Sequence, residues 1–111
     1  MPIKYNNFKV LVPILIAASL VVAPEYSAAH NYKPTDGYVQ SADVAIEIAE
    51  AVLKSIYGEK LIISERPFTA TLTQEGVWIV KGSLKKNKKG GVAEIWISKD
   101  NGAIIKVTHE L

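Results

Sequence analysis

Few side chains in this sequence have the types and spacing that catalysis or metal binding requires. The two histidines, His30 and His109, have no partner at a metal-binding spacing such as His-x-x-x-His. None of the serines lies in a Gly-x-Ser-x-Gly motif. The absence of cysteine excludes thiol enzymes, iron–sulfur proteins and structural zinc modules. The sequence therefore predicts a protein that is not an enzyme and that has no catalytic residues, metal ligands or cofactor.

Two isolated polar residues remain as weaker candidates for chemistry. Glu94 is the one carboxylate inside the predicted sheet, where it could serve as the buried acid of a pocket. The alternative, which we expect, is a solvent-facing Glu94 beside a cross-strand lysine such as Lys106. His109, near the end of the last predicted strand, is expected to be a solvated polar residue.

Side chains suited to protein recognition are better represented. Trp78 and Trp96 fall on neighbouring positions of a predicted strand pair, and tryptophan is enriched at binding hot spots. The alternative is that one or both pack beneath the helix. A basic loop, the lysine loop, follows at residues 85–91. It is either a solvated loop or an electrostatic anchor that speeds encounter with an acidic partner. The candidate partner-binding residues are Trp78, Trp96, Lys85, Lys86, Lys88 and Lys89.

One amphipathic helix is predicted over residues 42–57. Ser41 can cap its start, and Gly58 stands where a C-terminal glycine cap belongs. Glu50 and Lys54 form a favourable i,i+4 pair. Alanines and Leu53 flank a continuous apolar stripe made of Val44, Ile48, Val52 and Ile56.

Beyond the helix the apolar period changes from about four residues to two. A short strand is predicted at 60–63, and alternating apolar residues then predict half-buried strands at 66–73, 77–84, 92–98 and 103–109. Short turns between successive strands favour an antiparallel meander. We therefore predict an α+β domain in which one long helix packs on a four-stranded antiparallel sheet.

The N-terminal residues 1–29 resemble a cleavable signal peptide. Lys4 and Lys9 supply a positive region, residues 10–23 are almost entirely apolar, and Pro24 ends the run. Small residues at 27–29 offer a cleavage site. The run is shorter than the ~20 apolar residues that a membrane-spanning helix needs. We therefore expect a periplasmic or secreted product.

The rest of the chain is expected to comprise a flexible lead-in at 30–40 and one domain at 41–111. With no cysteine available for lipid attachment, no stable membrane anchor is expected after cleavage. The whole chain carries 13 basic and 11 acidic side chains. Such a near balance argues against a dedicated nucleic-acid-binding protein.

Several sequence blocks, taken in order, resemble one family: the bacterial immunity proteins with a nuclear-transport-factor-2-like fold, the YbbC/YhhH group. The resemblance covers about residues 38–109 and implies a reduced fold of that type, comparable also with a cystatin-like fold. It further implies neutralisation of a cognate polymorphic toxin by binding, with no catalytic residues to transfer. The blocks are AIEIAE (45–50), YGE (57–59), RPF (66–68), VWIVKG (77–82), GGVAEI (90–95) and KDNG (99–102).

Two other functional hypotheses stay open at this point. The segment 95–104 is similar to the closing hairpin of PepSY-type domains, which implies an exported module that inhibits or regulates a secreted peptidase. A small enzyme or ligand carrier is the third hypothesis, and it requires a deep pocket with a buried acid. The leading hypothesis is an exported immunity protein that binds its toxin stoichiometrically in the cell envelope.

Overall fold

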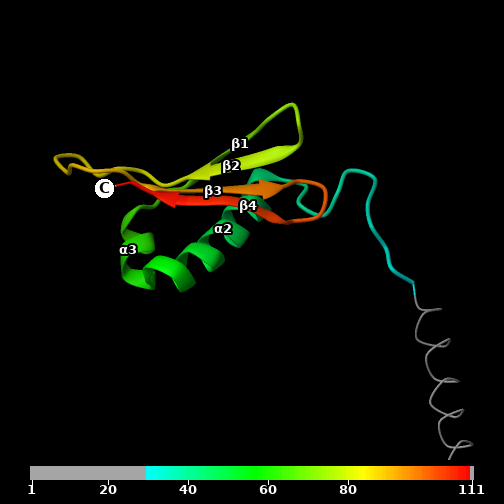
Figure 1. Ribbon diagram of the computed structural model, residues 1–111, viewed down its shortest axis with the longest axis horizontal. Coiled ribbons are helices and arrows are strands. Elements are labelled where there is room, and N and C mark those ends of the chain that lie inside the picture. Colours follow the sequence, from blue (N-terminus) through cyan, green and yellow to red (C-terminus); the bar gives the residue numbers. More distant parts are fainter. Residues whose placement is uncertain (1–29, 111) are drawn as a thin grey trace, which may run out of the picture. The chain divides into compact units, whose positions relative to one another are not determined.

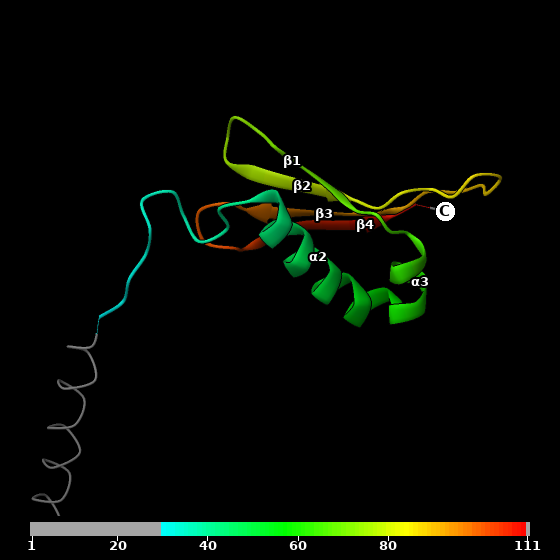
Figure 2. The ribbon, with the colours of Figure 1, turned by 180° about the vertical axis from the view of Figure 1, so that it is seen from behind.

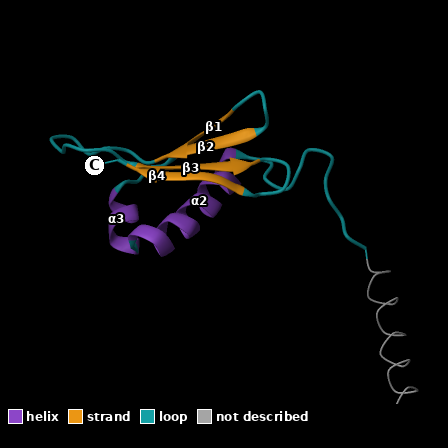
Figure 3. Ribbon diagram, in the orientation of Figure 1, coloured by secondary structure: helices purple, strands orange, loops and turns teal. Residues whose placement is uncertain are grey.

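A computed structural model describes residues 30–110 of the chain, so the predicted signal peptide at 1–29 lies outside the described residues. From Lys33 onward the residues cluster as one unit of two helices and four strands (Figures 1 and 3). The elements are α2 (Ala42–Tyr57), α3 (Glu59–Ser64), β1 (Thr69–Leu72), β2 (Val77–Lys81), β3 (Ala93–Ser98) and β4 (Ile104–His109). Within the described residues, no helix has the length and apolar character to cross a membrane.

The sheet is an antiparallel meander with the strand order β1-β2-β3-β4, and both helices lie on one of its faces (Figures 1 and 2). The predicted fold class is therefore confirmed. A register shift between Trp96 and Ile97 interrupts the β3–β4 pairing. As a result Lys106 lies opposite Trp96, whereas Ile97 lies opposite Ile104.

Helix α2 begins and ends where the sequence predicts, but its buried face differs from the predicted stripe. The Ser41 side chain accepts a hydrogen bond from the Val44 amide at 3.3 Å, and Gly58 takes a φ of 100°. Val44 and Ile56 are 39% and 52% exposed. The side chains fully buried against the sheet are Ala45, Ala49 and Leu53. Small alanines let the helix axis approach the sheet closely, which the bulkier stripe would prevent.

The predicted strand at 60–63 is wrong, because residues 59–64 form the short helix α3. A short apolar run does not distinguish a strand from a buried helical turn by periodicity alone. Ile62 is fully buried and packs in the core, which holds α3 against the rest of the domain. The predicted strand at 77–84 also ends early, at Lys81, leaving Leu84 half exposed in the following loop.

The core lies between α2 and the helix-facing side of the central strands. Trp78 and Val80 of β2 alternate with residues that face away, and Ala93, Ile95 and Ile97 do the same on β3. This two-residue alternation is the pattern expected of a sheet covered on one face. The core depends on apolar packing without disulfide support, since the chain has no cysteine.

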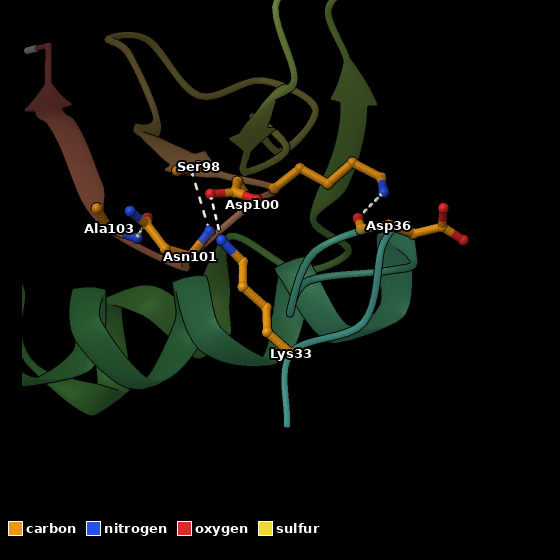
Figure 4. A network of polar contacts seen from close by, with 7 residues as sticks. Lys33, Asp36, Ser98, Asp100, Asn101 and Ala103 are labelled. Carbon is orange, nitrogen blue, oxygen red and sulfur yellow. Dashed lines mark hydrogen bonds and ion pairs between the residues drawn. The ribbon is translucent and has the colours of Figure 1, made fainter. Parts of the chain in front are cut away.

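The segment predicted to be a flexible lead-in is instead attached to the β3–β4 turn. Val39 is 1% exposed, and its amide donates a hydrogen bond to the Lys99 carbonyl at 3.0 Å. Lys33 forms an ion pair with Asp100 at 2.6 Å, and Lys99 reaches the Asp36 carbonyl (Figure 4). The folded unit therefore begins before residue 41, because Val39 completes the end of the core.

Candidate functional site

A pocket of about 370 Å³ lies where α3, the segment 83–91 and the end of β4 meet. We call it the lysine pocket. Its lining combines apolar side chains with three of the four loop lysines, two glutamates and a histidine. Its lining includes Leu61, Leu84, Lys85, Lys88, Lys89, Glu65, His109 and Glu110.

A Glu65–His109 pair forms the polar part of the pocket lining. Glu65 is 6% exposed and is the buried charged residue of the described chain. Its Oε2 atom lies 2.7 Å from Nε2 of His109, and its Oε1 atom accepts a hydrogen bond from the Ala93 amide at 2.8 Å. The other imidazole nitrogen, Nδ1, lies 3.0 Å from the Glu110 carbonyl. The pair thus joins α3 to the start of β3 and the end of β4.

Local backbone structure explains why Glu65 reaches this buried position. It directly follows α3, and its amide bonds to the Ile62 carbonyl at 3.0 Å. The Glu65 carbonyl in turn accepts a hydrogen bond from the Ser83 amide at 2.7 Å. Gly82 leaves room for the carboxylate, because a Cβ atom there would lie only 2.8 Å from Glu65 Oε1. Gly82 is therefore required for close packing.

The Glu65–His109 pair connects three segments of the fold through its polar contacts. Both imidazole nitrogens and both carboxylate oxygens face protein partners within hydrogen-bond distance. No cluster of three or more potential metal-ligating side chains occurs among residues 30–110.

The sequence-based interpretation of His109 was wrong, and Glu65 was missed. The His109 side chain is 12% exposed, and its ring centroid lies 5.2 Å from that of Tyr57, so it is not a solvated terminal residue. Glu65 and His109 are 44 residues apart in the chain. No local pattern reveals their pairing. A glutamate directly before Arg66-Pro67, at the end of an apolar run, is a weak signal that sequence inspection could have used.

The lysine loop contains a hydrogen-bonded turn and is exposed from residue 85 to residue 90. The Lys88 amide bonds to the Lys85 carbonyl at 3.1 Å, and Asn87 adopts a φ of 67°. The Lys85 ammonium donates to the Arg66 carbonyl at 3.1 Å. All four predicted partner-binding lysines are exposed, but Lys85, Lys88 and Lys89 line the pocket and Lys86 does not.

Arg66 connects this region to α2. Its guanidinium donates to both carboxylate oxygens of Glu50, with a shortest distance of 2.7 Å. The hydrogen bond from Arg66 to Glu50, followed by their charge attraction, raises the pKa of Arg66 above its ordinary value. Lys54 lies farther from Glu50, at 3.9 Å, so the predicted Glu50–Lys54 pair is present but Arg66 is the closer partner.

The two candidate tryptophans lie on opposite faces of the sheet. Trp78 is 8% exposed, and its indole nitrogen donates to the Val39 carbonyl at 2.8 Å. It belongs to the core, so it has little surface to offer a partner. Trp96 is half buried on the face away from the helices, with the Lys106 ammonium 4.6 Å from its ring centroid. The structure therefore does not bring the two tryptophans together.

Glu94 lies beside Trp96 and outside the lysine pocket. Its carboxylate accepts a hydrogen bond from the Trp96 indole at 2.6 Å and lies 4.0 Å from the Lys81 ammonium. A cross-strand lysine does lie beside Glu94, but it is Lys81, because the register places Lys81 opposite Glu94 and Lys106 opposite Trp96. The buried acid that a pocket hypothesis requires is Glu65, not Glu94.

Comparison with known proteins places this fold in a family. Residues 44–111 match the model of the NTF2 fold immunity proteins. The chain is 33% identical over 72 residues to the uncharacterized protein YbbC of Escherichia coli (strain K12), which covers 64% of this chain and 58% of YbbC. It is 34% identical over 73 residues to the uncharacterized protein YhhH of the same organism, which covers 64% of this chain and 56% of YhhH.

The chain spans little more than half the length of these two relatives. No solved structure matches it. The family model nevertheless covers both helices' packing surface, the whole sheet and the lysine pocket. This chain belongs to the NTF2 fold immunity protein family.

Proposed function

We propose that this protein is an exported immunity protein that neutralises a cognate polymorphic toxin by stoichiometric binding in the cell envelope. The match of residues 44–111 to the immunity-protein family is the observation that carries this proposal. The polar groups of the pocket support a binding role, because Glu65 and His109 already satisfy one another and neighbouring backbone groups.

The envelope location is inferred from the N-terminal sequence. Residues 1–29 combine a basic start, an apolar run and a small-residue cleavage site, which is typical of exported proteins. An immunity protein has to meet its toxin where the toxin arrives or acts. The toxin is therefore expected to reach or to work in the periplasm.

The proposal is tested by protection and by binding. A candidate toxin domain from a neighbouring gene is targeted to the periplasm of a bacterial host, with either the full chain or a variant lacking residues 1–29. We expect the full chain to restore growth and the truncated variant, retained inside the cell, to fail. A toxin lethal only in the cytoplasm would contradict the proposed location.

Purified toxin and immunity protein should also form a complex of equal subunit numbers, which light scattering after size exclusion can measure. Complexes of this kind reach very low dissociation constants even with interfaces of ordinary size. An active toxin that fails to bind the purified protein would refute the proposed function.

A further inference from the structure

We propose that the lysine pocket is the toxin-binding site and that it receives an acidic segment of the toxin bearing an apolar side chain. The inference rests on the proposed function and adds the location of the interface and the chemistry of the partner. The four loop lysines were predicted from the sequence to bind a partner as a group. The structure divides them, because Lys85, Lys88 and Lys89 line the pocket and Lys86 does not.

The charge of the pocket favours a carboxylate ligand. The basic lining residues are Lys85, Lys88 and Lys89, and the acidic ones are Glu65 and Glu110. Glu65 is held by His109 and by the Ala93 amide. The three lysines outnumber the two glutamates, so the lining has an excess of basic side chains. Complementary charge of this kind increases association rates and selects an acidic partner.

The apolar part of the pocket favours a hydrophobic side chain next to the acidic group. Leu61 of α3 is 42% exposed and Leu84 is 50% exposed, and both line the pocket. Covering exposed leucine surface is favourable in proportion to the apolar area removed from water. A volume of about 370 Å³ is at the lower end of the range for ligand pockets. It suits one or two protruding side chains rather than a folded element.

The pocket is also held in a defined shape before any partner binds. The Glu65–His109 pair ties α3 to β3 and β4, and the Lys85 ammonium is bonded to the Arg66 carbonyl. Groups that are already ordered lose less conformational entropy on binding. Lys85 is therefore held in place before binding, unlike a charge on an unstructured loop.

Matched substitutions within one loop test this proposal. Binding of the candidate toxin domain is measured for the wild-type protein as it is exported, and for the Lys88→Gln, Lys89→Gln and Lys86→Gln variants. We expect Lys88→Gln and Lys89→Gln each to weaken binding by roughly fivefold to tenfold, the range of a moderate hot spot. Lys86→Gln, which changes the same charge outside the pocket, should weaken binding by less than about twofold.

A second pair of variants tests the apolar wall. Leu61 and Leu72 are both 42% exposed, but only Leu61 lines the pocket. We expect Leu61→Ser to weaken binding by about tenfold and Leu72→Ser to leave it unchanged within about twofold. Circular dichroism and thermal unfolding establish that each variant is folded before binding is compared.

The outcomes separate this inference from the proposed function. If the wild-type protein does not bind an active toxin, the proposed function fails, and the inference with it. If the wild type binds but Lys86→Gln weakens binding as much as Lys88→Gln and Lys89→Gln, the loop acts only as a diffuse charge and the pocket is refuted. Wild-type affinity in the Leu61→Ser variant would likewise exclude the apolar wall from the interface.

Discussion

Replacing Glu65 by alanine should remove a large share of the stability of the fold. The substitution leaves the buried Ala93 amide without its acceptor at 2.8 Å, which costs about 1–3 kcal/mol. It also removes the carboxylate 2.7 Å from His109 Nε2, and a hydrogen bond to a charged group contributes about 1.5–3 kcal/mol. Because the His109 side chain is 12% exposed, water can replace part of that loss. We therefore expect a total near 3 kcal/mol.

The size of this loss matters because a domain of this length is only marginally stable. Native proteins have about 0.05–0.15 kcal/mol of unfolding free energy per residue, which gives roughly 4–12 kcal/mol for about 80 residues. Urea denaturation followed by circular dichroism measures the change directly. For a urea m-value near 1 kcal/mol/M, typical of small domains, the midpoint should fall by about 3 M with an unchanged slope.

Two further variants control this experiment. Glu65→Gln keeps an oxygen for the Ala93 amide and offers an amide donor to His109, so its loss should be nearer 1 kcal/mol, within the range of one ordinary hydrogen bond. Glu94→Ala removes a carboxylate that accepts a hydrogen bond from the Trp96 indole and lies 4.0 Å from the Lys81 ammonium. Both contacts are on the open face of the sheet, where water can replace them, so this variant should cost less than about 1 kcal/mol. Equal midpoints for Glu65→Ala and Glu94→Ala would refute the structural role of the Glu65–His109 pair.

Three other predictions concern the core and the attached N-terminal segment. Trp78→Phe should lower the free energy of unfolding by about 1–3 kcal/mol, because it removes the hydrogen bond to the buried Val39 carbonyl. In the wild-type protein, acrylamide should quench the fluorescence of Trp96 more readily than that of Trp78. Equal quenching would contradict the placement of the two tryptophans on opposite faces. Gly82→Ala should destabilise by about 1–3 kcal/mol, seen as a lower Tm, because the added methyl group overlaps Glu65; an unchanged Tm would show that the packing can relax. The Val39 amide should be protected from hydrogen exchange, whereas exchange at the rate of an unfolded chain would restore the flexible lead-in.

The lead-in and helix α3 show where sequence reasoning on this protein reached its limit. Residues 30–40 lack apolar periodicity, and the turn residues within them favour an irregular segment. Yet Val39 is buried, because it meets the Trp78 indole and the β3–β4 turn at distant positions in the chain. In the same way, the apolar run at 60–63 carries no information on which partner will cover it. Its helical form depends on Ile62 finding the core.

The candidate site could be predicted only in part. The basic loop was recognised from its composition, but its division into pocket lysines and the exposed Lys86 depends on how the loop folds against α3. The tryptophans were recognised by residue type, but the strand register decides which face each one occupies. Trp78 pairs with Ile97 and Trp96 pairs with Ile79, which puts the two indoles on opposite faces.

The sequence by itself determined the features that arise from neighbouring residues. Capping by Ser41 and Gly58, the helix at 42–57, the two-residue alternation of the strands and the short turns between them all follow from local chemistry, and together they indicate a helix on an antiparallel sheet. Only the tertiary structure decided which helix face is buried and which acid pairs with His109. Those outcomes depend on contacts between distant segments, which local periodicity does not encode, so the buried Glu65–His109 pair and the lysine pocket emerge only when α3, β3 and β4 come together.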